Sequence, residues 1–141
     1  MVHADLAMRF NASADRVWGV LTGPEMVPLL LESYAEKVEF ESTGNRPVFV
    51  TTLRGGGVIR ERLELVDHEE RHLKYRVLDA GPLPYANYTG EAHVQPCGDK
   101  ACVLSFQCRF IAVEVSEAEA LRHWTEHNRE VMATLRKFVE A

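Results

Sequence analysis

The strongest constraint on the fold is the order of two hydrophobic periods along the chain. Apolar and polar residues alternate through residues 2–10 and through most of 35–110, which is typical of strands with one buried face. After Ser116 the spacing becomes three and four, which is typical of an amphipathic helix. The positions with this spacing are Leu121, Trp124, Asn128, Val131, Leu135 and Phe138. The chain therefore predicts one sheet with one long helix to cover its apolar face.

Short turns separate the predicted strands. The alternating segments cover residues 2–10, a stretch from 35 that includes Val38 and Phe40, and then 48–53, 58–66, 73–78, 86–94 and 102–110. Turn residues lie between them, such as Gly55-Gly56-Gly57 and Gly81-Pro82-Leu83-Pro84. Consecutive short strands with tight turns predict an antiparallel meander.

Three helices are predicted. Ser13 is placed to cap a short helix that ends at Gly23-Pro24, and a second short helix follows over residues 24–31. Ser116 and Glu119 form a capping box at the start of the long helix. The 141 residues are thus expected to form a single α+β domain, 1–141. It has a seven-stranded curved antiparallel sheet wrapped around the C-terminal helix, with two short helices between the first two strands.

Composition excludes several classes of protein. The net charge of −5 argues against nucleic-acid binding, because such proteins carry a basic face. No apolar run approaches the roughly 18 residues of a membrane span, and no apolar leader follows Met1, so we expect no membrane partner and no secretory signal. Three cysteines without a CxxC pair favour a reduced, cytoplasmic setting, although Cys97 and Cys102 could pair across a turn.

One carboxylate interrupts an inward-facing apolar row. Glu61 shares a strand face with Ile59, Leu63 and Leu65. Burial of an unpaired carboxylate is costly and raises its pKa. Two interpretations stay open: the side chain reaches water or an arginine near the strand end, or it serves in a pocket as a general acid or base.

Other polar groups lie on faces predicted to be buried. Tyr88 lies beside the small residues Gly90 and Ala92, and is either a satisfied core tyrosine or a hydroxyl that orients a ligand. Asn128 interrupts the apolar stripe of the long helix and bonds either to backbone or to a ligand. Cys108 is expected to be a buried small residue.

No metal or cofactor site is predicted. His123 and His127 have the HxxEH spacing of some zinc peptidases, but Trp124 is expected to turn both toward the flank of the helix, and no later helix supplies a third ligand. The triple glycine lacks the GK[ST] element of a phosphate loop.

Three segments carry a family resemblance: IRERLELVD from Ile59, YANYT from Tyr85, and SFQC from Ser105 with the later His123-Trp124. They resemble the START-like (Bet v 1-like, SRPBCC) superfamily, which includes polyketide cyclase/dehydrase-like proteins, and within it the plant lachrymatory-factor synthases in particular. The resemblance implies a helix-grip fold.

The resemblance also implies a site. In lachrymatory-factor synthases a glutamate on the fourth strand works with an arginine on the preceding strand, beside a tyrosine. Glu61 and Tyr88 match the glutamate and the tyrosine, whereas Val48 falls near the place of the arginine. The resemblance further implies gate loops over the pocket mouth, here residues 54–57 and 81–85.

We therefore expect a small, largely apolar ligand between the sheet and the helix. Glu61 and Tyr88 are the candidate catalytic residues for cyclisation, dehydration or isomerisation by proton transfer, with Tyr88 bonding the developing oxyanion. A non-catalytic carrier or receptor is the alternative, and the acidic surface gives weaker support to a partner-binding module. The candidate ligand-binding residues are Phe49, Ile59, Leu63, Tyr75, Leu83, Tyr85, Leu104, Phe106, Trp124 and Asn128.

Overall fold

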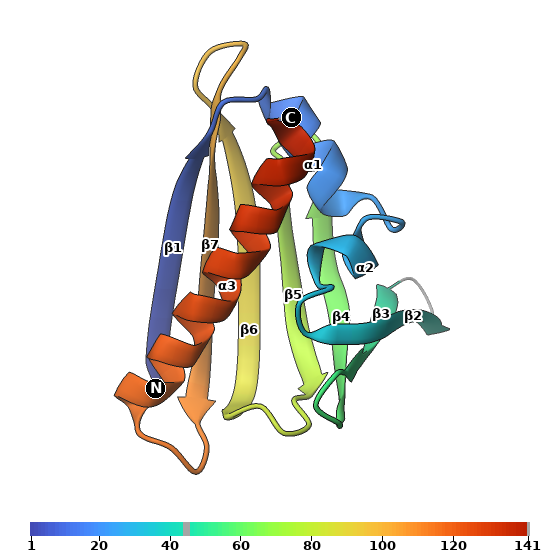
Figure 1. Ribbon diagram of the computed structural model, residues 1–141, viewed down its shortest axis with the longest axis vertical. Coiled ribbons are helices and arrows are strands. Elements are labelled where there is room, and N and C mark those ends of the chain that lie inside the picture. The colour runs from blue at the N-terminus through green and yellow to red at the C-terminus, as the bar shows by residue number, and fades with distance from the viewer. Residues whose placement is uncertain (44–45, 141) are drawn as a thin grey trace.

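The computed structural model, which describes residues 1–43 and 46–140, has the predicted helix-grip architecture (Figure 1). The strands are β1 (Val2–Phe10), β2 (Ala35–Thr43), β3 (Arg46–Leu53), β4 (Val58–Asp67), β5 (His72–Asp79), β6 (Tyr85–Pro96) and β7 (Cys102–Ala112). The helices are α1 (Ala14–Thr22), α2 (Val27–Leu30) and α3 (Glu117–Val139). Among the described residues no helix has the length and apolar character of a membrane span.

The strands form one antiparallel sheet in the order β1-β7-β6-β5-β4-β3-β2. Neighbours in the sequence are therefore neighbours in the sheet, except that β1 pairs with β7. Helix α3 runs diagonally across one face of this curved sheet, and α1 packs beside its C-terminal end (Figure 1). The predicted meander and the covering helix are both confirmed.

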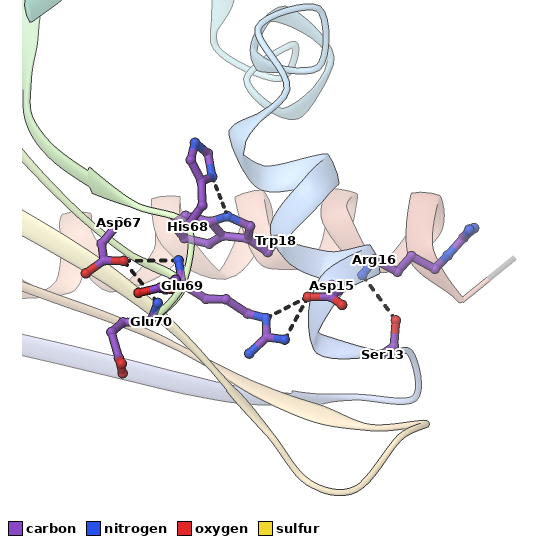
Figure 2. Close-up of polar contacts among 9 residues, drawn as sticks. Ser13, Asp15, Arg16, Trp18, Asp67, His68, Glu69 and Glu70 are labelled. Carbon is purple, nitrogen blue, oxygen red and sulfur yellow. Dashed lines mark hydrogen bonds and ion pairs between the residues drawn. The ribbon is translucent and has the colours of Figure 1, made fainter.

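Polar contacts hold α1 against the β4–β5 turn (Figure 2). The Ser13 hydroxyl accepts a hydrogen bond from the backbone N–H of Arg16 in the first turn of α1, as predicted for the cap. Arg71 donates two bonds to Asp15, at 2.9 and 2.7 Å. The indole N–H of Trp18 donates to Nδ1 of His68 at 3.0 Å. These contacts and the apolar side of α1 close one end of the space between the sheet and α3.

The buried stripe of α3 differs from the predicted one at its two ends. Leu121 and Phe138 are 38% and 37% exposed, so their predicted burial was wrong. Ala120 and Val139 take the buried positions instead. A straight α-helix drifts relative to a strict alternation of three and four, and the error accumulates away from the centre of the helix.

Two β-bulges change which residues face inward. Leu63 opposes Tyr75 and Leu65 opposes Lys74, so β4 has one extra residue between them. Leu65 is consequently 43% exposed, and its predicted inward position was wrong. In β6 an extra residue near Asn87, which has a φ of 53°, interrupts the pairing with β7.

Candidate functional site

The interior is solid at the α1 end and hollow at the other. The packed end is a cluster that includes Phe10, Val17, Leu104 and Leu135, all with exposures of 0%. Toward α2 and the β3–β4 hairpin a cavity of about 580 Å³ lies between the sheet and α3. This confirms the expected hollow interior, whose volume is in the range of ligand pockets.

The structure brings most of the predicted site residues together. Those that line the cavity are Glu61, Tyr88, Ile59, Tyr75, Leu83, Tyr85, Trp124 and Asn128. Four predicted residues lie elsewhere: Leu104 belongs to the packed end, Phe106 packs between the two core clusters, Phe49 packs edge-on against Phe40, and Leu63 is half-buried on β4. Alternation along a strand identifies the inward face, but it does not say which end of that face is filled.

Glu61 is held in the cavity without a partner. It lies on β4 opposite Val77 of β5 and Phe49 of β3. Within residues 1–43 and 46–140, no side chain forms a hydrogen bond or ion pair with its carboxyl group. The side chain keeps partial accessibility because it lines an open cavity, yet burial raises the pKa of the carboxyl from 4.5 to about 7. The interpretation that Glu61 reaches an arginine is therefore wrong.

All four tyrosines of the sequence line this cavity: Tyr34, Tyr75, Tyr85 and Tyr88. Tyr85 and Tyr88 are three residues apart, so strict alternation would place them on opposite faces. The extra residue in β6 lets both face inward. Burial is the main cause that raises the pKa of each of the four phenols, so the cavity offers neutral hydroxyls.

The hydroxyl of Tyr88 is part of a hydrogen-bonded chain. The indole N–H of Trp124 donates to it at 2.7 Å, and the hydroxyl of Tyr75 lies 3.1 Å away. The ring of Tyr75 covers Gly90, one of the small residues beside Tyr88: a Cβ on Gly90 would lie 2.5 Å from Cζ of Tyr75. The side-chain amide of Asn128 donates a hydrogen bond to the backbone oxygen of Trp124 at 2.9 Å. Of the two interpretations of Asn128, the bond to backbone is the one observed.

Both histidines of α3 border the cavity: His123 stays exposed, as expected of a flank position, whereas His127 is half-buried. The hydroxyl of Tyr85 lies 2.6 Å from Nδ1 of His123, and the ring of Tyr34 meets His127 edge-on, with centroids 4.3 Å apart. Burial lowers the pKa of His127 to about 4, so this imidazole is neutral at physiological pH. Throughout the part of the chain that the structure describes, no three His, Cys, Asp or Glu residues lie close enough to hold a metal ion.

The two predicted gate loops lie over the cavity. Residues of both loops line it. The two loops also contact each other, because a Cβ on Gly57 of the first loop would lie only 2.7 Å from Cδ of Pro82 of the second. Arg54 is the only lysine or arginine among the described lining residues. Its Nε donates to the backbone oxygen of Glu32 at 2.7 Å, which holds the first loop against the end of α2.

Another hollow, of about 620 Å³, lies over β1, β7, β6 and β5. Charged side chains from these strands and from β4 line it, among them Asp5, Glu64, Lys74, Glu91 and Arg109. The cavity under α3 is the better candidate site, because its lining is mainly apolar and its polar groups converge.

A family comparison agrees with this geometry. The model of the family described as "Polyketide cyclase / dehydrase and lipid transport" matches residues 1–140. The chain belongs to this family. The predicted START-like, Bet v 1-like relationship of the chain is thereby confirmed.

Solved structures show the same fold in this superfamily. The protein XoxI from Bacillus cereus is 24% identical, with a TM-score of 0.84 over 97% of this chain and 94% of that one. Norcoclaurine synthase from Thalictrum flavum, in complex with dopamine and hydroxybenzaldehyde, is 24% identical, with a TM-score of 0.76 over 96% and 84%. Zhui aromatase/cyclase from Streptomyces sp. R1128 is 19% identical, with a TM-score of 0.74 over 97% and 90%. The curated proteins contain no match.

This family member lacks the arginine that the resemblance to lachrymatory-factor synthases implies. Val48, near the expected place of the arginine, is 1% exposed. In the register of β3 and β4 it lies opposite Arg62, and Phe49 lies opposite Glu61. Tyr34 and His127 also line the cavity, and the sequence pattern did not mark either of them as a lining residue. Tyr34 lies in the turn between α2 and β2, where no periodicity marks an inward position.

Proposed function

We propose that this protein binds a small, largely apolar molecule in the cavity under α3 and transfers a proton to or from it through Glu61. The observation that carries the proposal is the unpartnered Glu61 carboxyl, whose pKa burial raises to about 7. An acid or base is most effective when its pKa is near the working pH. Perturbed carboxyl groups in clefts are candidates for function on the same grounds.

The lining supports the class of ligand. Apolar side chains from the sheet and the loops, including Leu53, Ile59, Val77 and Leu83, surround the carboxyl. Apolar area of this kind binds apolar molecules by removing their surface from water. The neutral phenols supply a few hydrogen bonds that orient the ligand.

The chemistry that fits is proton transfer next to a carbonyl group. The ionised carboxylate of Glu61 takes a proton from carbon, and a phenolic hydroxyl donates a hydrogen bond to the oxyanion that develops. Return of the proton to another atom completes an isomerisation, and loss of water or ring closure would give dehydration or cyclisation. The family description includes cyclases and dehydrases.

A non-catalytic carrier or receptor is the second candidate. The observation that favours it is the lack, among the described residues, of a cation paired with Glu61. Lipid transport also stands in the family description.

Mass spectrometry of the protein under native conditions tests both candidates. We expect a bound small apolar molecule, and that molecule, added to apoprotein, should be converted by the wild type. Glu61→Gln should retain binding and lose turnover, whereas the matched surface variant Glu69→Gln should retain both. Binding without turnover by the wild type would support the carrier. A protein that takes up no apolar molecule would refute both.

A further inference from the structure

The chain of hydrogen bonds behind Glu61 has a direction. An indole N–H can only donate, so the bond of 2.7 Å from Trp124 to Tyr88 occupies a lone pair of the Tyr88 oxygen. Trp124 is 2% exposed and Tyr88 is 5% exposed, so neither group can exchange this partner for bulk water. The Tyr88 hydroxyl is thereby an acceptor on the side of α3, and its single proton is left for another partner.

Two acceptors compete for the Tyr88 proton. One is the Tyr75 oxygen, at 3.1 Å, and the other is the sulfur of Cys108. Sulfur is the weaker acceptor, so the Tyr88 proton points to Tyr75. Because each phenol has one proton, Tyr75 then keeps its own proton for a third group.

Of the two hydrogen-bonded phenols, Tyr75 is the one that lies toward Glu61, whose charge also raises the pKa of Tyr34 in the turn between α2 and β2. The charge of Glu61 contributes to the raised pKa of Tyr75, whereas it does not contribute to that of Tyr88. Gly90 determines this placement, because any side chain there would collide with the Tyr75 ring. Tyr75 also lies on β5, directly opposite Leu63 of β4 and two residues from Val77, the partner of Glu61.

We infer that the hydroxyl of Tyr75, rather than that of Tyr88, donates the hydrogen bond to a carbonyl oxygen of the ligand beside Glu61. Tyr88 and Trp124 are positioning residues that aim this proton. The inference deepens the proposed function and rests on it. It narrows the ligand to a compound with a carbonyl group next to an acidic C–H bond.

The step balances within these groups. The Glu61 carboxylate forms an O–H bond as the C–H bond breaks, and the electron pair moves through carbon to the carbonyl oxygen. The resulting enolate oxygen accepts the hydrogen bond from Tyr75. Return of the proton from Glu61 to another carbon regenerates the carboxylate and yields an isomer.

A pair of isosteric probes tests the assignment. Methyl naphthyl ketone carries the carbonyl oxygen, and isopropenylnaphthalene has a methylene group in its place. Affinities of both are measured for the wild type, Tyr75→Phe and Tyr88→Phe, and the carbonyl stretching frequency of the bound ketone is measured by infrared difference spectroscopy.

We expect Tyr75→Phe to weaken ketone binding roughly threefold to tenfold, the loss of one net hydrogen bond, and to leave binding of the hydrocarbon within about twofold. The carbonyl stretch should rise in Tyr75→Phe and stay low in Tyr88→Phe. Retained hydrocarbon binding shows that each variant is folded, and a structural role alone would not change the ratio of the two affinities.

The reverse pattern, a ketone-selective loss in Tyr88→Phe alone, would overturn the inference and leave the proposed function standing. Equal ketone binding by all three proteins would also overturn it. If the wild type bound neither probe, the proposed apolar cavity function would fail, and the inference would fail with it.

Discussion

Replacement of Glu61 by glutamine tests the origin of its raised pKa. In the folded protein the carboxyl titrates near 7, against 4.5 when it is freely solvated. Each pKa unit corresponds to about 1.4 kcal/mol, so ionisation inside the cavity costs up to about 3 kcal/mol. Because the side chain is partly accessible, we expect about 2 kcal/mol in practice.

The sign follows from proton linkage. The folded state holds the Glu61 proton between pH 4.5 and about 7, where the unfolded state has already lost it. The free energy of unfolding of the wild type therefore falls as the pH rises through this window and is level above it. Glu61→Gln has no proton to lose at this position, so it should match the wild type near pH 4.5 and exceed its stability at about pH 8 by about 2 kcal/mol.

Urea denaturation at several pH values measures this difference. All other titratable groups are common to both proteins, so their contributions cancel in the difference. Glu69→Gln, an exposed residue of the β4–β5 turn, is the matched control and should show no such window. Parallel curves for wild type and Glu61→Gln, or a Glu61 carboxyl that titrates near 4.5 by NMR, would refute the reasoning.

Three further substitutions have expected outcomes. Gly81→Ala should lower the free energy of unfolding by about 1–3 kcal/mol, because Gly81 has a φ of 54° and a Cβ there would lie 2.4 Å from a backbone oxygen of β4. The control Gly55→Ala has open space around it and should be nearly neutral. Thermal unfolding measures both. Tyr85→Phe removes the bond of 2.6 Å to its histidine partner and should cost about 1 kcal/mol in chemical denaturation, and an unchanged stability would show that bond to be weak. Ser116→Ala should cost about 1 kcal/mol by removing the cap of α3, which the helical circular dichroism on heating would report.

Local sequence signals predicted the elements because they act over a few residues. The caps Ser13 and Ser116 bond to the amides expected of them. The alternation predicted every strand, since a strand with one buried face needs no information from elsewhere in the chain. In the sheet, the error lies where a single extra residue changes the phase, since Leu65 turned outward after the bulge in β4.

The candidate site was predicted only in part. Glu61 and Tyr88 could be found because a polar group on an apolar face is visible in the pattern itself. The roles of Tyr34, His123 and His127 could not be found, because they depend on how α3 and the α2–β2 turn meet the sheet. The packing of α3 on the sheet also decides that Leu104 lies in the filled core and that Ile59 lies in the cavity wall.

The sequence by itself determined the order of strands and helices, the inward faces and the buried carboxylate, because hydrophobic period and capping are properties of neighbouring residues. Only the tertiary structure decided where the interior stays hollow and which hydroxyls share the cavity with Glu61. The Tyr75 ring lies across Gly90, fifteen positions along the chain, and Trp124 of α3 orients Tyr88 of β6. Contacts between residues so far apart are set when the helix packs on the sheet, and no local pattern records them.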